Sequence, residues 1–169
     1  MPIVQWIHDL IRAYAGGPRL LEVALAGVPP DEIRFIPGPE HWSIHENVLH
    51  LADTELVGAA RIRYLVAEPE ATLASFHGNR WARVLDYSSQ SIDDALTLIR
   101  ATRRVTTTLL SHLPVETWEK TGANWKRIEA DSEPDTLTLA ELVEQCVEHM
   151  RYHLRTIARR RAQYAQAKS

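Results

Sequence analysis

The sequence predicts an all-α protein, a four-helix bundle with long connections between the second and third helices and between the third and fourth. Three observations support this prediction. Several long segments carry apolar residues three and four positions apart, which is the spacing of an amphipathic helix. Glycine occurs only 7 times in 169 residues, and the Asn-Gly and Asp-Gly dipeptides typical of tight hairpins are absent. We therefore expect one helical domain over residues 1–169, a length that can bury a substantial core.

The first helix is expected from about Ile3 to Ala26, with an interruption in its middle. Gly16, Gly17 and Pro18 follow one another there. A proline inside a helix lacks a backbone donor, and its ring clashes with the carbonyl one turn earlier. The sequence therefore predicts a kink or a break at this point.

The second helix is expected to begin after Ser43 and to continue to about Ala67. Ser43 and Glu46 have the spacing of a capping box, in which each side chain bonds the backbone amide of the other residue. Pro69 limits any extension beyond this helix. Residues 68–90 then form a connection that is too long to be a simple turn, and long loops are often functional.

The third helix is expected from near Ser91 to near Leu113. Asp93 and Asp94 fall in its first turn, where negative charge stabilises the helix end. A second long connection, residues 114–137, follows it and carries Trp118 and Trp125.

The last helix is expected from near Thr138 to about Tyr164, because Thr138 and Glu141 repeat the capping-box spacing. Beyond Glu148 the chain has no acidic residue, and its charges are all positive. Our default interpretation is that these charges stabilise the carboxy end of the helix through its dipole, and an anion-binding arm is the alternative. The basic residues are Arg151, Arg155, Arg159, Arg160, Arg161 and Lys168.

Composition and charge exclude several classes of protein. The formal net charge of −3 argues against a dedicated nucleic-acid binder. Cys146 is the single cysteine, so an internal disulfide and a cysteine-based zinc cluster are both excluded. No run of about 20 apolar residues is present, and the amino terminus lacks the pattern of a secretion signal. We therefore expect a cytoplasmic protein without a membrane partner.

Two histidines on the last helix have the spacing of metal ligands. His149 and His153 are four residues apart on the apolar stripe, so both imidazoles leave one face of the helix, a spacing suited to one metal ion. Two core histidines bonded to backbone or carboxylates are the alternative. His50 is the best third ligand because it lies within the apolar segment VLHLAD, although the main apolar stripe of its helix passes to one side of it. His45 and His77 are weaker candidates.

Two motifs connect these residues to a known family. The run HWSIHENVLHLADTE resembles the second-helix motif of the DinB/YfiT-like superfamily, and EHMRYHLRTI resembles its last-helix motif. The resemblance covers about residues 18–160. It implies a four-helix bundle with zinc or nickel held by three histidines that match His50, His149 and His153. It also implies a homodimer, and it places Trp81 in the wall of a pocket.

Three neutral nitrogen ligands leave coordination positions open, which is typical of a catalytic rather than a structural site. A metal there can lower the pKa of bound water or hold a thiol as thiolate. The resemblance implies a hydrolase, or an enzyme that transfers a low-molecular-weight thiol onto a small electrophilic substrate. The alternatives are a non-catalytic, stress-related binding module with a structural metal or none, and a helical interaction protein that pairs with a second copy. The resemblance implies no general base.

Three neighbours of the histidines have two interpretations each. Asp53, one turn after His50, either orients that imidazole or faces water. Glu46, one turn before His50, either caps its helix or supplies a fourth ligand, and we favour the cap. Cys146, one turn before His149, either offers a soft thiolate or is a small buried hydrophobe, which is the commoner role of a lone cysteine.

Overall fold

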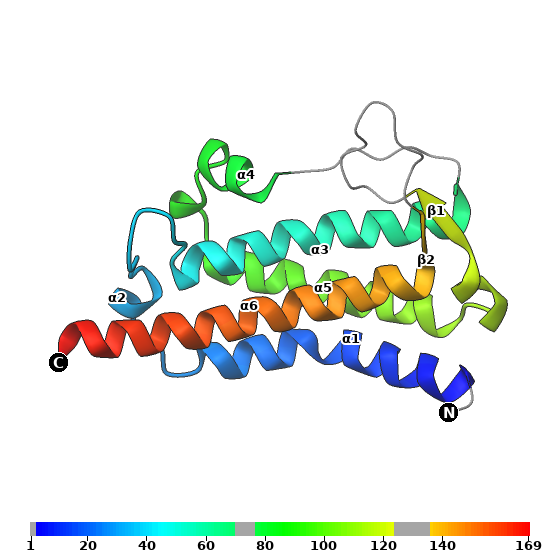
Figure 1. Ribbon diagram of the computed structural model, residues 1–169, viewed down its shortest axis with the longest axis horizontal. Helices are drawn as coiled ribbons and strands as arrows, with labels where there is room; N and C mark the ends of the chain where they lie inside the picture. Colours follow the sequence, from blue (N-terminus) through cyan, green and yellow to red (C-terminus); the bar gives the residue numbers. More distant parts are fainter. Residues whose placement is uncertain (1–2, 70–76, 124–135) are drawn as a thin grey trace.

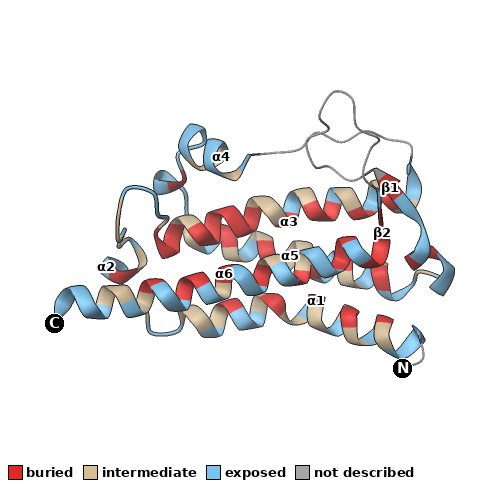
Figure 2. Cartoon of the chain, in the orientation of Figure 1, coloured by how far each residue is buried: buried red, intermediate tan, exposed pale blue. Residues whose placement is uncertain are grey.

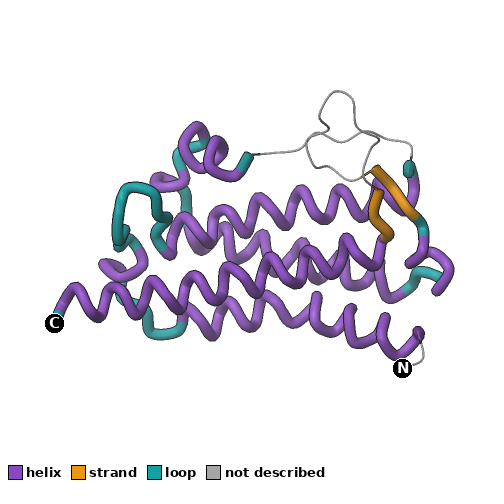
Figure 3. Tube along the Cα trace, in the orientation of Figure 1, coloured by secondary structure: helices purple, strands orange, loops and turns teal. Residues whose placement is uncertain are grey.

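The computed structural model describes residues 3–69, 77–123 and 136–169, and it is dominated by helices (Figure 1; Figure 3). The four long helices are α1 (Ile3–Leu25), α3 (Ile44–Ala67), α5 (Ile92–Ser111) and α6 (Leu139–Lys168). Four short helical segments connect them: α2 (Pro30–Ile33), α4 (Gly78–Val84), η1 (Tyr87–Ser89) and η2 (Val115–Glu119). The all-α prediction is confirmed. None of the described helices combines the length and the apolar character needed to cross a membrane.

The long helices pack as a square in which helices adjacent in the sequence are not always neighbours. Both α1 and α3 pack against α5 and α6, so α1 and α3 lie on one diagonal and α5 and α6 on the other. Figure 1 shows that α3 and α5 run in the same direction along the bundle. The chain between them must therefore return over the length of the bundle, which is why that connection is long, and α4 and η1 lie on its return path.

Both predicted capping boxes are present. The Ser43 hydroxyl accepts a hydrogen bond from the Glu46 amide at 3.1 Å, and the Glu46 carboxylate accepts one from the Ser43 amide at 2.8 Å. Thr138 and Glu141 make the same pair of bonds at 3.1 and 2.7 Å. The helix that Thr138 begins continues to Lys168, one turn beyond the predicted end.

Of the kink or break predicted in the first helix, the break is wrong, because α1 is one helix that includes Pro18. Proline offers no amide hydrogen, so the Tyr14 carbonyl one turn earlier loses its usual helical partner. The Arg103 guanidinium on α5 donates a hydrogen bond to this carbonyl at 2.8 Å and replaces that partner. At Gly17, next to Pro18, α1 packs closely on α6, since a Cβ there would lie 3.3 Å from Cγ of Met150.

The second long connection contains more structure than predicted. A two-stranded antiparallel sheet pairs β1 (Thr121–Ala123) with β2 (Thr136–Thr138), with Thr121 opposite Thr138. Trp118 in η2 is buried in the core, whereas Trp125 lies outside the described residues. A strand pair this short has no periodicity that a sequence pattern can detect.

The core consists of two apolar clusters with a polar layer between them, and Figure 2 shows buried residues along all four long helices. One cluster includes Trp118 and Leu137 near the sheet, and the other includes Ile44 and Ile157.

The polar layer between the clusters is built around Arg103. Its guanidinium donates to both carboxylate oxygens of Glu55, at 2.6 and 2.5 Å, and lies 3.9 Å from the centre of the Tyr14 ring. Both members of this ion pair are buried.

Candidate metal centre

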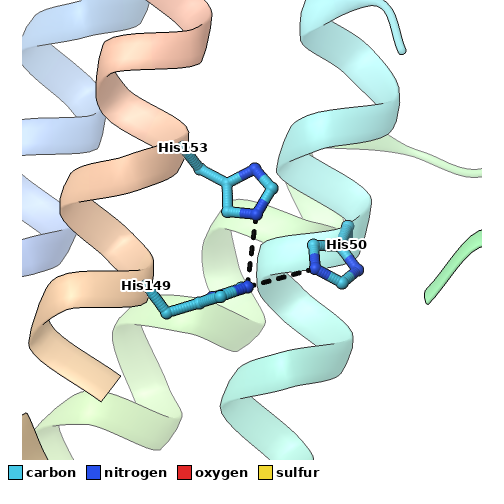
Figure 4. A group of neighbouring side chains, drawn as sticks. All are labelled: His50, His149 and His153. Carbon is cyan, nitrogen blue, oxygen red and sulfur yellow. Dashed lines mark hydrogen bonds between the residues drawn. The ribbon is translucent and has the colours of Figure 1, made fainter. Parts of the chain in front are cut away.

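Three imidazoles from two helices converge on one point (Figure 4). His50 comes from the second turn of α3, and His149 and His153 lie one turn apart on α6, which packs against α3. Nε2 of His149 lies 3.3 Å from Nε2 of His50 and 3.2 Å from Nε2 of His153. The structure therefore brings together the three histidines that the sequence singled out, and all three ligand nitrogens lie within 4.8 Å of one another.

The spacing of these nitrogens fits a divalent metal ion. Two imidazole nitrogens that each bind zinc at about 2.1 Å with tetrahedral geometry are about 3.4 Å apart. The two distances from His149 Nε2 are close to this value, so the rings need only small movements to share an ion. A cation between the rings could accept lone pairs from all three nitrogens at once, whereas one ring hydrogen cannot satisfy all three.

The protein environment keeps these imidazoles neutral, which is the form that binds metals. Burial lowers the pKa of His50 and His149 to about 4 and that of His153 to about 3. Neighbouring histidines lower the pKa further for His50 and His153, and the positive charge of Arg103 does so for His149. At neutral pH the cluster therefore offers three uncharged nitrogen ligands.

Asn47, on α3 one turn before His50, determines which nitrogen of His153 faces the cluster. Its side-chain Nδ2 donates to the Ser43 carbonyl at 2.7 Å, so the amide oxygen Oδ1 is the atom that faces His153. This oxygen lies 2.7 Å from His153 Nδ1. Because Oδ1 can only accept, Nδ1 carries the hydrogen and Nε2 keeps its lone pair for a metal.

Trp42 and Gly78 both lie against the His50 imidazole. The Trp42 ring centre lies 4.8 Å from that of His50 and 6.4 Å from that of His153, to which it is nearly parallel. Gly78 begins α4 and lies against the same imidazole, since a Cβ there would come within 2.7 Å of His50 Cε1. The missing side chain therefore lets α4 cover the His50 ring.

Two cavities meet at the cluster. One, of about 240 Å³, is mostly apolar and is bordered by His50 and His149 together with Gly58, Leu142 and Cys146.

The other, of about 440 Å³, is polar and is bordered by His50 and His153 together with Trp42, Tyr152, Arg159 and Arg160. A small molecule can therefore approach the cluster from two chemically different sides.

The three predicted neighbours of the cluster occupy different environments. Glu46 is in the capping box, as we favoured. The Asp53 carboxylate accepts a hydrogen bond from the Tyr87 hydroxyl and lines a separate cavity beside Asp94, so the structure pairs it with Tyr87 rather than with His50. Cys146 lines the apolar cavity, and burial raises the pKa of its thiol to about 12, which keeps it protonated.

The remaining candidates lie around the site. Trp81 on α4 packs against the apolar cluster that includes Ile44, and Trp42 is the tryptophan that borders the polar cavity. His45 is buried, and its Nε2 lies 3.0 Å from the Tyr87 carbonyl, a contact between α3 and η1. His77 is exposed at the residue before α4.

Sequence reasoning missed Asn47, Trp42 and Gly78 as site residues. Asn47 and Trp42 both fall within the motif around His50, and the one-turn spacing of Asn47 from His50 was an available signal. Gly78 had none, because its role depends on how a long connection folds back over α3.

Comparisons with known proteins agree with this architecture. The family model described as the DinB superfamily matches residues 13–157. A protein of Geobacillus thermodenitrificans (strain NG80-2), provisionally named a metal-dependent hydrolase, is 24% identical over 107 residues, which are 63% of this chain and 60% of that protein. A protein of Oceanobacillus iheyensis with the same provisional name is 24% identical over 119 residues, 70% of this chain and 66% of its own. The matched region thus spans less than two thirds of the length of these relatives.

The solved structure of YfiT from Bacillus subtilis, described as a candidate metal-dependent hydrolase with an unusual four-helix bundle topology, superposes with a TM-score of 0.82. The superposition covers 94% of this chain and 87% of that one at 17% sequence identity, and it shows a shared fold. The family model covers most of the bundle and both histidine segments, so this chain belongs to the DinB superfamily.

Proposed function

We propose that this protein is a metal-dependent enzyme in which His50, His149 and His153 hold a zinc or nickel ion. The observation that carries the proposal is the convergence of three neutral Nε2 atoms at a spacing that fits one ion. The provisional names of the relatives support the same class of protein.

The proposed reaction is the attack of water or a low-molecular-weight thiol on a small electrophile. A divalent ion with three protein ligands supplies Lewis acidity and makes a bound water or thiol more acidic. The chain supplies the positioning: Asn47 holds His153 in the correct tautomer, and Trp42 and Gly78 restrict the His50 ring. The two cavities beside the cluster offer space for the nucleophile and for the electrophile.

The proposal does not use Cys146 or Glu55 as the attacking group or as the base. The Cys146 thiol is protonated at neutral pH because burial raises its pKa. The Glu55 carboxylate is held by both donors of the Arg103 guanidinium. Neither of these two groups is therefore available as an ionised nucleophile or a free base, and the proposal assigns the attack to water or to a thiol substrate.

Metal content tests the proposal directly. Protein purified without an affinity tag, and the same protein after exposure to zinc or nickel, should contain one ion per chain by mass spectrometry of the metal. His153→Ala should abolish this stoichiometric binding, whereas His8→Ala, which changes an exposed histidine on α1, should retain it. Wild-type protein that binds no metal after reconstitution would refute the proposal.

Turnover separates an enzyme from a structural metal site. The metal-loaded protein should be screened against small esters, amides and electrophiles, with and without a thiol. A catalytic site should lose turnover in His153→Ala with a modest change in the free energy of unfolding. Stability that falls sharply with metal loss, in a protein without turnover, would instead indicate a structural metal.

A further inference from the structure

The polar cavity beside His50 and His153 carries an excess of positive charge. Arg159 and Arg160 border it, and Glu40 is the carboxylate among its lining residues in the described part of the chain. His41, His50 and His153 also border it. Two guanidinium groups therefore face this cavity against one carboxylate on its described lining.

The helix dipole does not explain these two arginines. Positive charge stabilises a helix only within about its last turn. Because α6 continues to Lys168, Arg159 and Arg160 lie about two turns before its end. The interpretation that we favoured from the sequence therefore does not apply to this pair.

Ion pairing inside the protein does not explain them either. Arg161 pairs with Glu32, and Arg151 pairs with Glu148. Arg159 forms no ion pair with any residue in the described ranges, and it is exposed where it meets the cavity.

Arg160 is held rigidly beside Arg159. It is buried, its Nε donates to the Trp42 carbonyl at 2.8 Å, and its Nη1 donates to the Gln163 side chain at 2.8 Å. Burial and the neighbouring charge of Arg159 lower the pKa of this guanidinium, so an anion placed between the two would relieve their repulsion. Trp42 connects Arg160 to the histidines, because its ring packs on His50 and His153.

We propose that this cavity is the binding subsite for the carboxylate of a small substrate, which Arg159 and Arg160 hold beside the histidine cluster. A carboxylate is an anion whose two oxygens match the planar, two-donor geometry of a guanidinium. The cavity volume of about 440 Å³ leaves room for a small organic acid whose reactive end points to the histidines. This inference names the substrate class for the proposed function, and its link to catalysis rests on that function.

Benzoate and its neutral isostere benzamide test the subsite. Each is titrated into wild-type protein, metal-free and zinc-loaded, and binding is followed by chemical-shift changes in ¹H–¹⁵N spectra around Asn79, Tyr152 and Thr156, which border the cavity. Benzoate should bind at least about tenfold more tightly than benzamide, a difference of ~1.4 kcal/mol.

Two matched variants complete the test. Arg159→Gln should remove most of the preference for benzoate, whereas Arg155→Gln, which removes an exposed arginine one turn earlier on α6, should retain it. Equal affinity for the two probes, or a preference that survives Arg159→Gln, would overturn the inference. Failure of the protein to take up either zinc or nickel would overturn the proposed function alone, because the metal-free titrations still decide whether the carboxylate subsite exists.

Discussion

Asn47 should control metal affinity without touching the metal. Its Oδ1 lies 2.7 Å from His153 Nδ1, and both residues are buried. In Asn47→Ala the hydrogen on His153 Nδ1 loses its acceptor, and the ring can move its hydrogen to Nε2, the atom that must bind the ion. Loss of such a hydrogen bond to a metal ligand typically weakens binding 10- to 100-fold, equal to ~1.4 to 2.7 kcal/mol.

Two companion variants distinguish this specific loss of zinc affinity from a general disruption of the fold. Asn47→Asp keeps an oxygen acceptor and adds negative charge, so its zinc affinity should equal or exceed that of wild-type protein. Asn79→Ala removes an exposed amide at the rim of the polar cavity and should leave the affinity unchanged. The Ser43 carbonyl keeps its bond from the Asn47 backbone amide at 3.1 Å in all of these proteins.

Competition against a chromophoric chelator of known zinc affinity measures the effect. Urea unfolding of the metal-free proteins should accompany it, because an unpaired buried donor costs about 1 to 3 kcal/mol. If Asn47→Ala bound zinc as tightly as wild-type protein, the argument that Asn47 orients His153 would be wrong.

Three further predictions concern packing, pH and the buried ion pair. Gly78→Ala should weaken zinc binding measurably by chelator competition, because its Cβ would lie 2.7 Å from His50 Cε1, whereas Gly16→Ala meets nothing within 4 Å and should stabilise α1 by about 0.5 to 1 kcal/mol. The free energy of unfolding of the metal-free protein should be highest above pH 6.5 and fall toward pH 4 by up to about 1.4 kcal/mol per pH unit for each histidine, because burial lowers the folded-state pKa values to about 3 to 4 and the unfolded chain binds the protons first. Urea titrations at several pH values check this, and a flat profile would contradict it. Glu55→Gln should destabilise the protein by about 3 to 5 kcal/mol in urea unfolding, because Arg103 would stay buried without its carboxylate partner, and a loss below 1 kcal/mol would show that the pair is dispensable.

Local sequence patterns were sufficient for the helices whose ends carry their own signals. Ser43 with Glu46, and Thr138 with Glu141, begin α3 and α6 where predicted, because a capping box needs only residues within one turn. Pro18 shows where such reasoning fails. Its effect on α1 depends on Arg103, which lies far away in the sequence and replaces the missing hydrogen bond at the Tyr14 carbonyl.

The sequence by itself determined the helical class of this protein and the pair His149 and His153, because helical periodicity and ligand chemistry are local properties. It offered His50 only as the best candidate for a third ligand, which the family resemblance supported. The tertiary structure alone decided the rest of the site. His50 lies beside the main apolar stripe of α3, yet it is buried because α6 packs on one side of it and Gly78 of α4 on another. Arg159 and Arg160 have the same charge as the other arginines of α6, and only the folded chain places them on a cavity next to the cluster.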